Sequence, residues 1–423
     1  MNADPLPYLT NDIEPIAASF RSRPEDFRVD ELLAFEPDGE GEHLMVRFEK
    51  TGLSTRAALR GIDKRLKLGR GAYGTAGQKD ARAITTQHVT IEGARADEVA
   101  RLDVPGLRVL GTVPHGRKLR TGQLAGNRFE IRLRGVPPFR VDDLHTAAER
   151  LRQRGVPNYF GQQRFGNRGD TALLGRQLLK GEFAEAVRTI AGRPSDRDHG
   201  RVKEARILFE ARSWRDAART WPHGYEDAAR LCMSMARFSG RTQQALFSME
   251  REDLRFYVSA YQAHLFNAVL AERMPAIDRL LAGDWAVRHE EPGMFPVEDV
   301  EREQPRATAF EISPTAPLFG AKVGLSAAEA GAVETRVLAA ADIAPEDFGN
   351  QRGSLKSSGS RRALRVRVAD LALEEGSDGE GAFTAARFML PSGSYATSLL
   401  RELLKNEGSP PPPPVAPSAP STP

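Results

Sequence analysis

Two kinds of hydrophobic spacing follow one another along this chain, and their order constrains the fold more than any single motif. Up to about residue 156, segments that alternate apolar and polar residues are mixed with segments of helical spacing. From about residue 170 to 350 helical spacing dominates, and strand patterns return in 362–373 and 381–390. This order predicts an α+β protein in which a helix-rich domain is inserted into a sheet domain that closes only near the C-terminus.

The individual elements are predicted from the same spacing. The clearest strand pattern lies at 43–50, where Leu44, Val46 and Phe48 fall on one face, and a second half-buried strand is predicted at 127–135. Helical spacing predicts helices over three segments: 55–69, 141–155 and 253–274.

The composition narrows the kinds of protein that this chain can be. A single cysteine, Cys232, excludes an intramolecular disulfide and a cysteine-based zinc site. The formal net charge of +3 is compatible with a nucleic-acid partner but does not require one. No apolar run approaches the length of about 18 residues that a membrane helix needs, and no secretory segment opens the chain. We therefore expect a cytoplasmic protein without a membrane partner.

The last segment, 409–423, contains eight prolines and no large apolar side chain. Such a segment cannot bury a core, so we expect a disordered tail of polyproline type. The alternative interpretation is a ligand for a proline-binding module.

The stretch 74–87, GTAGQKDARAITTQ, allows two interpretations. A phosphate-binding loop of the Walker type needs Gly-x4-Gly-Lys-Ser/Thr, but Gln78 separates Gly77 from Lys79, and Asp80 takes the place of the hydroxyl residue. We therefore reject that interpretation, and predict that the small residues let a bulky substrate approach the Asp80 carboxylate. The alternative is that Asp80 caps a turn.

Two other stretches carry candidate chemistry. In 115–129, cationic side chains surround turn-forming glycines, which suits a surface that follows a phosphate backbone, although an ordinary solvated hairpin would look the same. In 158–169, aromatic residues and arginines alternate with glycines, which suits stacking on unpaired bases or packing at a domain junction. Asp196, Asp198 and His199 are the nearest approach to a metal-binding cluster, but a solvated loop explains them better, and we expect no metal.

Five separated blocks resemble the TruD family of tRNA pseudouridine synthases, and they occur in the order typical of that family. They cover nearly the whole chain before the proline-rich segment. The blocks are 24–56, 76–87, 115–129, 157–166 and 393–403, with a shorter similarity at 360–366.

The resemblance implies a specific domain organisation. The first part of a catalytic sheet domain would be 1–156, a helix-rich TRUD insertion domain would occupy 157–360, and the last part of the catalytic domain would be 361–408, before the tail at 409–423.

The resemblance also implies the site residues. The catalytic carboxylate falls on Asp80 and its basic partner on Arg21, and the active-site aromatic position falls on Phe129. The remaining positions are substrate-binding (Asn127, Phe27, Lys79, Gln87) or RNA-binding (Arg117, Lys118, Arg120, Arg164).

The function implied by the resemblance is conversion of uridine 13 of tRNA to pseudouridine, by a monomer that needs neither cofactor nor metal. An ionised carboxylate would act as nucleophile at C1′ or as base at C2′, and the residues do not decide between these. Burial would raise the pKa of Asp80, and the guanidinium of Arg21 would counter it.

Two other classes of protein stay open. One is an RNA-binding or RNA-folding protein on the same scaffold, and the other is an unrelated α+β enzyme in which Asp80 acts as a base on a small substrate.

Overall fold

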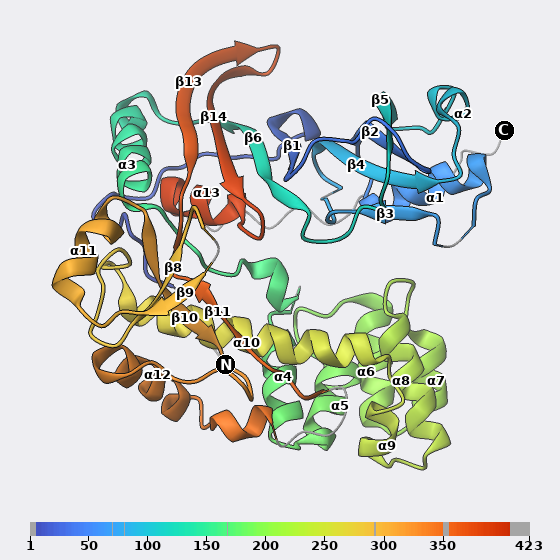
Figure 1. Cartoon of the computed structure of the whole chain (residues 1–423). Coiled ribbons are helices and arrows are strands. Elements are labelled where there is room, and N and C mark those ends of the chain that lie inside the picture. Colours follow the sequence, from blue (N-terminus) through green and yellow to red (C-terminus); the bar gives the residue numbers. More distant parts are fainter. Residues whose placement is uncertain are drawn as a thin grey trace. The chain divides into compact units, whose positions relative to one another are not determined.

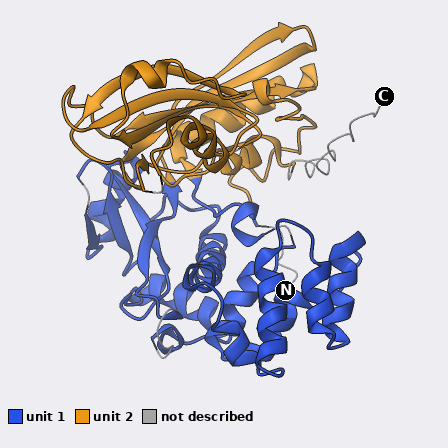
Figure 2. Ribbon diagram, turned by 90° about the vertical axis from the view of Figure 1, so that its right-hand side faces the viewer, with its two compact units in different colours: residues 1–7, 157–365 blue, residues 8–156, 366–423 orange. Residues whose placement is uncertain are grey.

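The structure of the chain is a computed structural model, and it describes residues 6–69, 71–79, 81–166, 168–291, 293–349 and 355–406. Asp80 and the proline-rich segment lie outside the described residues. The chain forms two compact units, coloured separately in Figure 2. The first combines Met1–Pro7 with Pro157–Arg365, and the second combines Tyr8–Val156 with Val366–Pro423. The predicted α+β class is confirmed, with most strands in the second unit and most helices in the first.

The second unit is built on an eight-stranded mixed sheet (Figure 1). The strands lie in the order β13-β14-β6-β1-β4-β2-β5, with β3 paired to β4. Among the described strands of this sheet, only β1 and β4 pair in parallel, and the other pairs are antiparallel. The strands are β1 (Phe27–Leu33), β2 (His43–Thr51), β3 (Tyr73–Thr75), β4 (Ile84–Glu92), β5 (Leu107–His115), β6 (Leu124–Arg134), β13 (Ala369–Asp378) and β14 (Gly381–Pro391).

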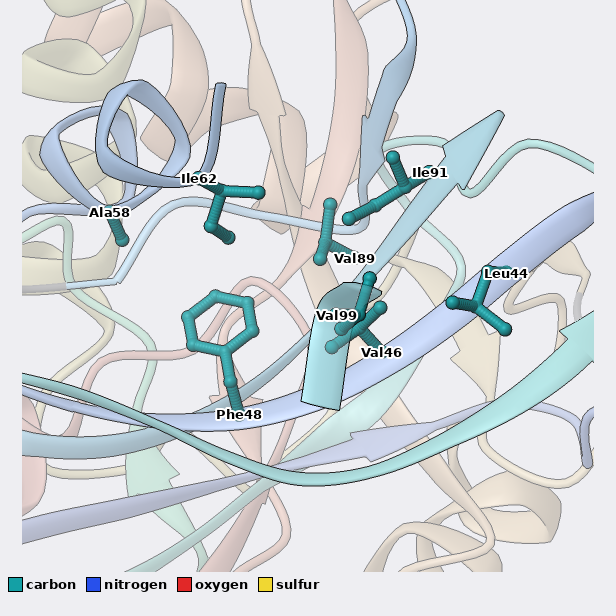
Figure 3. Close-up of a cluster of buried hydrophobic side chains, with 8 residues drawn as sticks. All are labelled: Leu44, Val46, Phe48, Ala58, Ile62, Val89, Ile91 and Val99. Carbon is teal, nitrogen blue, oxygen red and sulfur yellow. The ribbon is translucent and has the colours of Figure 1, made fainter. Parts of the chain in front are cut away.

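One face of strands β2 and β4 forms a hydrophobic core with two helices, α1 (Thr55–Leu66) and α2 (Ala96–Ala100). The buried side chains drawn in Figure 3 are Leu44, Val46, Phe48, Ala58, Ile62, Val89, Ile91 and Val99. Along β2 the same face continues from Phe48 to Lys50, and along β4 it continues from Val89 to Gln87, because side chains of a strand alternate between faces. The face is therefore apolar at one end and polar at the other, where the candidate site lies.

The remaining helices of this unit are α3 (Val141–Arg154) and α13 (Ala396–Leu404), and short 3₁₀ turns occur at Pro24–Asp26 and Pro138–Arg140. The predicted strands at 43–50 and 127–135 are confirmed as β2 and β6, and the predicted helices at 55–69 and 141–155 as α1 and α3. Helix α1 ends earlier than predicted, because Lys67 adopts a left-handed conformation with φ of 54°.

The first unit contains the long helix α10 (Arg251–Arg273), which confirms the prediction at 253–274, and a small sheet that was not predicted. The sheet order is β11-β10-β8-β9. Its central strand β10 contains Pro314 and Pro317, and proline usually argues against a strand with neighbours on both sides. The other elements are α4 (Thr171–Leu179), α5 (Phe183–Ala191), α6 (Gly200–Glu210), α7 (Trp214–Thr220), α8 (Glu226–Arg237), α9 (Thr242–Leu246), α11 (Val300–Thr308), α12 (Ala328–Ala340), β8 (Trp285–Arg288), β9 (Met294–Pro296), β10 (Ile312–Leu318), β11 (Ser360–Ala363) and 3₁₀ turns at Gln162–Phe165 and Pro345–Phe348.

Two short strands, β7 (Val156–Pro157) and β12 (Arg365–Val366), lie where the chain passes between the units. None of the described helices has the length and apolar character needed to cross a lipid bilayer.

The basic segment 116–123 is not the turn of a hairpin, so that interpretation is wrong. Strand β5 before it pairs with β2 at the edge of the sheet, whereas β6 after it pairs with β1 and β14. The segment therefore connects two strands that are separated by β2, β4 and β1.

Candidate active site

An arginine and three phenylalanines form one end of the candidate site. The guanidinium carbon of Arg21 lies 4.1 Å from the centre of the Phe27 ring. Phe27 meets Phe129 edge to face, with ring centres 6.3 Å apart, and Phe129 stacks on Phe388 at 5.1 Å. The rings come from β1, β6 and β14, whose pairing brings them together. The structure thus joins three residues predicted separately, Arg21, Phe27 and Phe129.

The backbone at Arg21 is unusual, because its φ of 68° lies in the left-handed region. For a residue other than glycine this conformation costs about 1–3 kcal/mol, and such residues are found preferentially at functional sites. The residue precedes the 3₁₀ turn at Pro24–Asp26 that leads into β1, so this bend in the chain accompanies the placement of the guanidinium over Phe27.

The loop that leads to Asp80 is held at three points. The carbonyl oxygen of Gly77 accepts a hydrogen bond from Gln87 Nε2 at 2.7 Å. The backbone nitrogen of Lys79 donates to Thr55 Oγ1 at 2.9 Å. The ammonium of Lys79 forms an ion pair with Glu31 Oε1 at 3.0 Å. The main chain and side chain of the residue before Asp80 are therefore both held by the sheet unit.

Glu31 keeps its negative charge although it is only 2% exposed. Its Oε2 accepts a hydrogen bond from the backbone nitrogen of His88 at 2.7 Å and lies 3.2 Å from His88 Nδ1. Burial alone would raise the pKa of Glu31, but the hydrogen bonds from His88 and the charge of Lys79 outweigh it, so this pKa lies below its ordinary value. Glu31 was not among the site residues predicted from the sequence, although it lies on the same buried face of β1 as Phe27 and Val29, which was a usable signal.

Three further polar side chains lie at this end of the sheet face. Lys50 is fully buried, and its Nζ donates to the carbonyl oxygen of Leu53 at 2.7 Å. Thr85 lies opposite Lys50, and Asn127 lies opposite Glu31, in neighbouring strands. Within the described residues, Thr85 Oγ1 and Asn127 Oδ1 are buried without a hydrogen-bond partner.

Of the residues predicted to bind substrate, Lys79 and Gln87 are engaged within the protein. The Lys79 side chain is 8% exposed and Gln87 is fully buried, with Gln87 Oε1 accepting a hydrogen bond from Thr55 Oγ1 at 2.9 Å. Both side chains hold the loop in this structure, whereas Asn127 Oδ1 has no hydrogen-bond partner in the part of the chain that the structure describes.

The role predicted for Gly74 was wrong. A Cβ atom there would lie 2.5 Å from both Leu119 O and Thr90 Oγ1, closer than any side chain tolerates. The lack of a side chain is therefore required by the packing of segment 116–123 against the loop, and not by the approach of a substrate.

Segment 116–123 helps to form a cationic pocket of about 480 Å³. The segment is fixed to the loop region, since Leu119 N donates to Thr90 Oγ1 at 2.8 Å and Gly122 N to Ala76 O at 3.3 Å. The pocket is lined by His43, Arg117, Lys118, Arg120 and Gln123, so it brings three of the predicted RNA-binding residues together.

Comparison with known proteins decides the family. The family model of tRNA pseudouridine synthase D (TruD) matches residues 6–403. The chain belongs to the TruD family.

Curated TruD proteins resemble the chain over almost its whole length. The tRNA pseudouridine synthase D of Geotalea daltonii is 37% identical over 400 residues, covering 95% of this chain and 100% of that protein. That of Anaeromyxobacter dehalogenans is 39% identical over 404 residues, covering 95% and 97%. The crystal structure of a Methanosarcina mazei protein assigned as TruD has a TM-score of 0.79 and 28% identity, covering 94% of this chain and 96% of that one.

The helix-rich unit of this TruD chain holds the fourth predicted RNA-binding residue, Arg164. Its guanidinium carbon lies 5.0 Å from the centre of the Phe256 ring, and its Nη2 donates to Ser259 Oγ at 2.7 Å. The neighbouring Phe160 packs edge to face against Phe266, and Tyr159 is buried. These contacts favour the packing interpretation for the first part of block 158–169.

The segment around Asp198 was predicted to be a solvated loop. For Asp198 this prediction is wrong, because the residue is only 5% exposed. Its carboxylate forms ion pairs with Arg206 at 3.3 Å and Arg168 at 3.4 Å, and accepts hydrogen bonds from Ser195. Among the described residues, no group of three or more histidine, cysteine, aspartate or glutamate side chains is placed to hold a metal ion.

Proposed function

We propose that this chain is a tRNA pseudouridine synthase that isomerises uridine 13 of tRNA to pseudouridine, with Asp80 as the catalytic carboxylate. The observation that carries the proposal is the anchoring of Gly77 and Lys79, immediately before Asp80, on the sheet face that also bears the cluster of Arg21, Phe27 and Phe129. The family match over residues 6–403 supports the same reaction.

The reaction is an isomerisation, and its atoms balance within the substrate. The bond between N1 of uracil and C1′ of ribose breaks, the base turns, and C5 forms the new bond to C1′. The proton lost from C5 is balanced by the proton gained at N1, so the step consumes no oxidant or reductant. Asp80 would begin it by attacking C1′ or by removing the proton from C2′, and both routes need the ionised carboxylate.

The described residues supply what the carboxylate and the detached base need. A guanidinium close to a carboxylate favours its ionised form, which is the role proposed for Arg21. Phe129 is held by stacking on Phe388, and its ring, which has no acidic hydrogen, would pack against the freed uracil. Asn127 Oδ1, buried and unpartnered among the described residues, would accept an N–H of the turning base.

Binding of the tRNA would draw on the cationic pocket. A base inside a stacked helix is out of reach of a catalytic side chain, so the target nucleotide must be extruded. Arg117, Lys118 and Arg120 would hold backbone phosphates while this happens, which positions the RNA without reading its sequence.

The test is Asp80→Asn, which preserves size but removes the charge. We expect tRNA affinity to stay near the wild-type value while pseudouridine formation at position 13 of a tRNA transcript falls by more than about 10²-fold. Asp103→Asn, at an exposed aspartate of the same unit, is the matched control and should leave both unchanged. A transcript with cytidine at position 13 tests the proposed target position.

Near-normal modification by Asp80→Asn would overturn the role of Asp80. Unfolding of this variant would favour the turn-capping alternative. If neither the wild-type protein nor Asp80→Asn forms pseudouridine but both bind tRNA, the RNA-binding alternative is correct, since the cationic pocket would suffice for binding RNA.

A further inference from the structure

We propose that Thr55 is a positioning residue for the catalytic carboxylate, acting through the main chain of Lys79 and together with Gln87. This inference rests on the proposed function and adds to it a side chain that was not among the predicted site residues. It concerns a fully buried threonine at the first position of helix α1.

The Thr55 hydroxyl makes two hydrogen bonds in opposite senses. Its oxygen accepts from Lys79 N at 2.9 Å, and its hydrogen is donated to Gln87 Oε1 at 2.9 Å. A hydroxyl has a single hydrogen, so this arrangement defines the direction of both bonds. It also defines the orientation of the Gln87 amide, whose Nε2 is then directed to Gly77 O at 2.7 Å. One hydroxyl therefore determines the positions of two main-chain atoms in the loop, Gly77 O and Lys79 N. Lys79 is the residue immediately before Asp80.

Thr55 is itself held firmly, so it can serve as a fixed reference. Ser54 caps helix α1 by accepting a hydrogen bond from Ala57 N at 3.2 Å. Lys50 on β2 donates to the carbonyl oxygen of Leu53 at 2.7 Å, which ties the start of the helix to the sheet. Further along α1, Ala58 and Ile62 are buried in the hydrophobic core.

Glu31 provides a second, independent anchor for Lys79. Its ion pair holds the Lys79 side chain, whereas Thr55 holds the Lys79 backbone. With both ends held, rotation of the chain about Lys79, the residue before Asp80, is restricted. Such precision matters, because a displacement of about 1 Å at a reacting group can slow a reaction by about 10²-fold.

The test compares two substitutions at Thr55. Thr55→Val keeps the shape but removes the hydroxyl, and Thr55→Ser keeps the hydroxyl. The single-turnover rate of pseudouridine formation, counted per molecule of folded, tRNA-binding enzyme, should fall by about 10- to 10²-fold in Thr55→Val. It should stay within about threefold of wild type in Thr55→Ser. The Kd for tRNA should be unchanged in both, because the hydroxyl touches the loop and not the RNA.

The matched control is Thr86→Val, the same chemical change at a half-buried threonine on β4. Its side chain alternates to the face opposite Thr85 and Gln87, so its rate should equal that of wild type. A purely structural role for Thr55 would lower the folded fraction and leave the rate per folded molecule unchanged.

The outcomes separate this inference from the proposed function. If Thr55→Val reacts within threefold of wild type while Asp80→Asn is inactive, the positioning inference is wrong and the proposed function stands. If Asp80→Asn is active, the proposed function fails and the positioning inference fails with it. Both the inference and the proposed function are supported if Thr55→Val forms pseudouridine slowly, Thr55→Ser forms it at the normal rate and Asp80→Asn is inactive.

Discussion

At the scale of single residues, the site depends on charges that are held inside the protein. Glu31 is a buried carboxylate with a lowered pKa, and its partner Lys79 is nearly buried as well. Removing one member of such a pair is costly, because the other is left as an uncompensated charge away from water. Glu31 therefore couples the stability of this unit to the geometry of the loop before Asp80.

This coupling predicts a dependence of stability on pH. Because the pKa of Glu31 in the folded state lies below the ordinary value of 4.5, its contribution is complete above about pH 4.5 and is lost as pH falls through the lower folded value. Glu31→Gln should reduce the free energy of unfolding by about 3–5 kcal/mol at pH 7. The difference from wild type should narrow in acid, as measured by urea unfolding between pH 7 and pH 3.

The control is Glu49→Gln, on β2, whose carboxylate pairs with the exposed Arg108 at 3.1 Å. A pair of this kind contributes about 0–1 kcal/mol, so little change is expected at any pH. A loss in Glu31→Gln that is the same at pH 7 and pH 3 would show that the charge of Glu31 is not what stabilises the fold.

At the scale of elements, segment 116–123 links strands that are not neighbours and carries cationic side chains past the loop. Leu119 is buried and bonded to Thr90, so the backbone is anchored while Arg117 and Arg120 are exposed on either side of it. Lys118 donates to the carbonyl oxygen of Gly71 and also lines the pocket. An anchored backbone with exposed cations is suited to binding phosphates.

Arg117→Ala and Arg120→Ala should each weaken tRNA binding and lower its dependence on salt. Each lost phosphate contact should reduce the slope of log affinity against log salt by about 0.7–0.9. Arg101→Ala, at an exposed arginine just after α2, is the control and should leave the slope unchanged. Affinity that falls in the two variants without a change in slope would mean that these arginines do not contact phosphate.

At the scale of the whole molecule, the sheet unit is assembled from both ends of the chain. Glu402 on α13 accepts hydrogen bonds from the backbone nitrogens of Leu9 and Thr10, at 2.8 and 3.2 Å. Leu403 and Leu404, at the end of that helix, are fully buried. The sheet unit therefore cannot be complete until the chain after the helix-rich unit has been made.

Deletion of 409–423 should leave the melting temperature and the rate of pseudouridine formation unchanged, because the hydrogen bonds described for Glu402 on α13 join it to Leu9 and Thr10, far in the sequence from the deleted segment. Deletion from residue 400 onward, the contrasting control, removes Leu400, Leu403 and Leu404 from the core and should prevent folding. A lower melting temperature or rate after the shorter deletion would show that the tail docks on the protein.

Much of the fold could be predicted from the sequence, because burial leaves a periodic signature in the chain. Alternation predicted strands at 43–50 and 127–135, where β2 and β6 lie, and helical spacing predicted helices at 55–69 and 253–274, where α1 and α10 lie. For the site, the family resemblance led to Arg21, Phe27 and Phe129, and the structure places Arg21 over Phe27 and Phe27 against Phe129.

Tertiary structure alone decided which elements are neighbours and which side chains bond to one another. Periodicity records that a residue is buried but not against what, so it could not separate a β5–β6 hairpin from a connection across the sheet. The contact between Thr55 and Lys79 spans 24 residues, and that between Glu31 and His88 spans 57. A hydrogen bond between residues so far apart in the chain depends on strand order and register, which arise only when the whole sheet packs. For that reason the contacts that support the loop before Asp80 could not be predicted from the sequence.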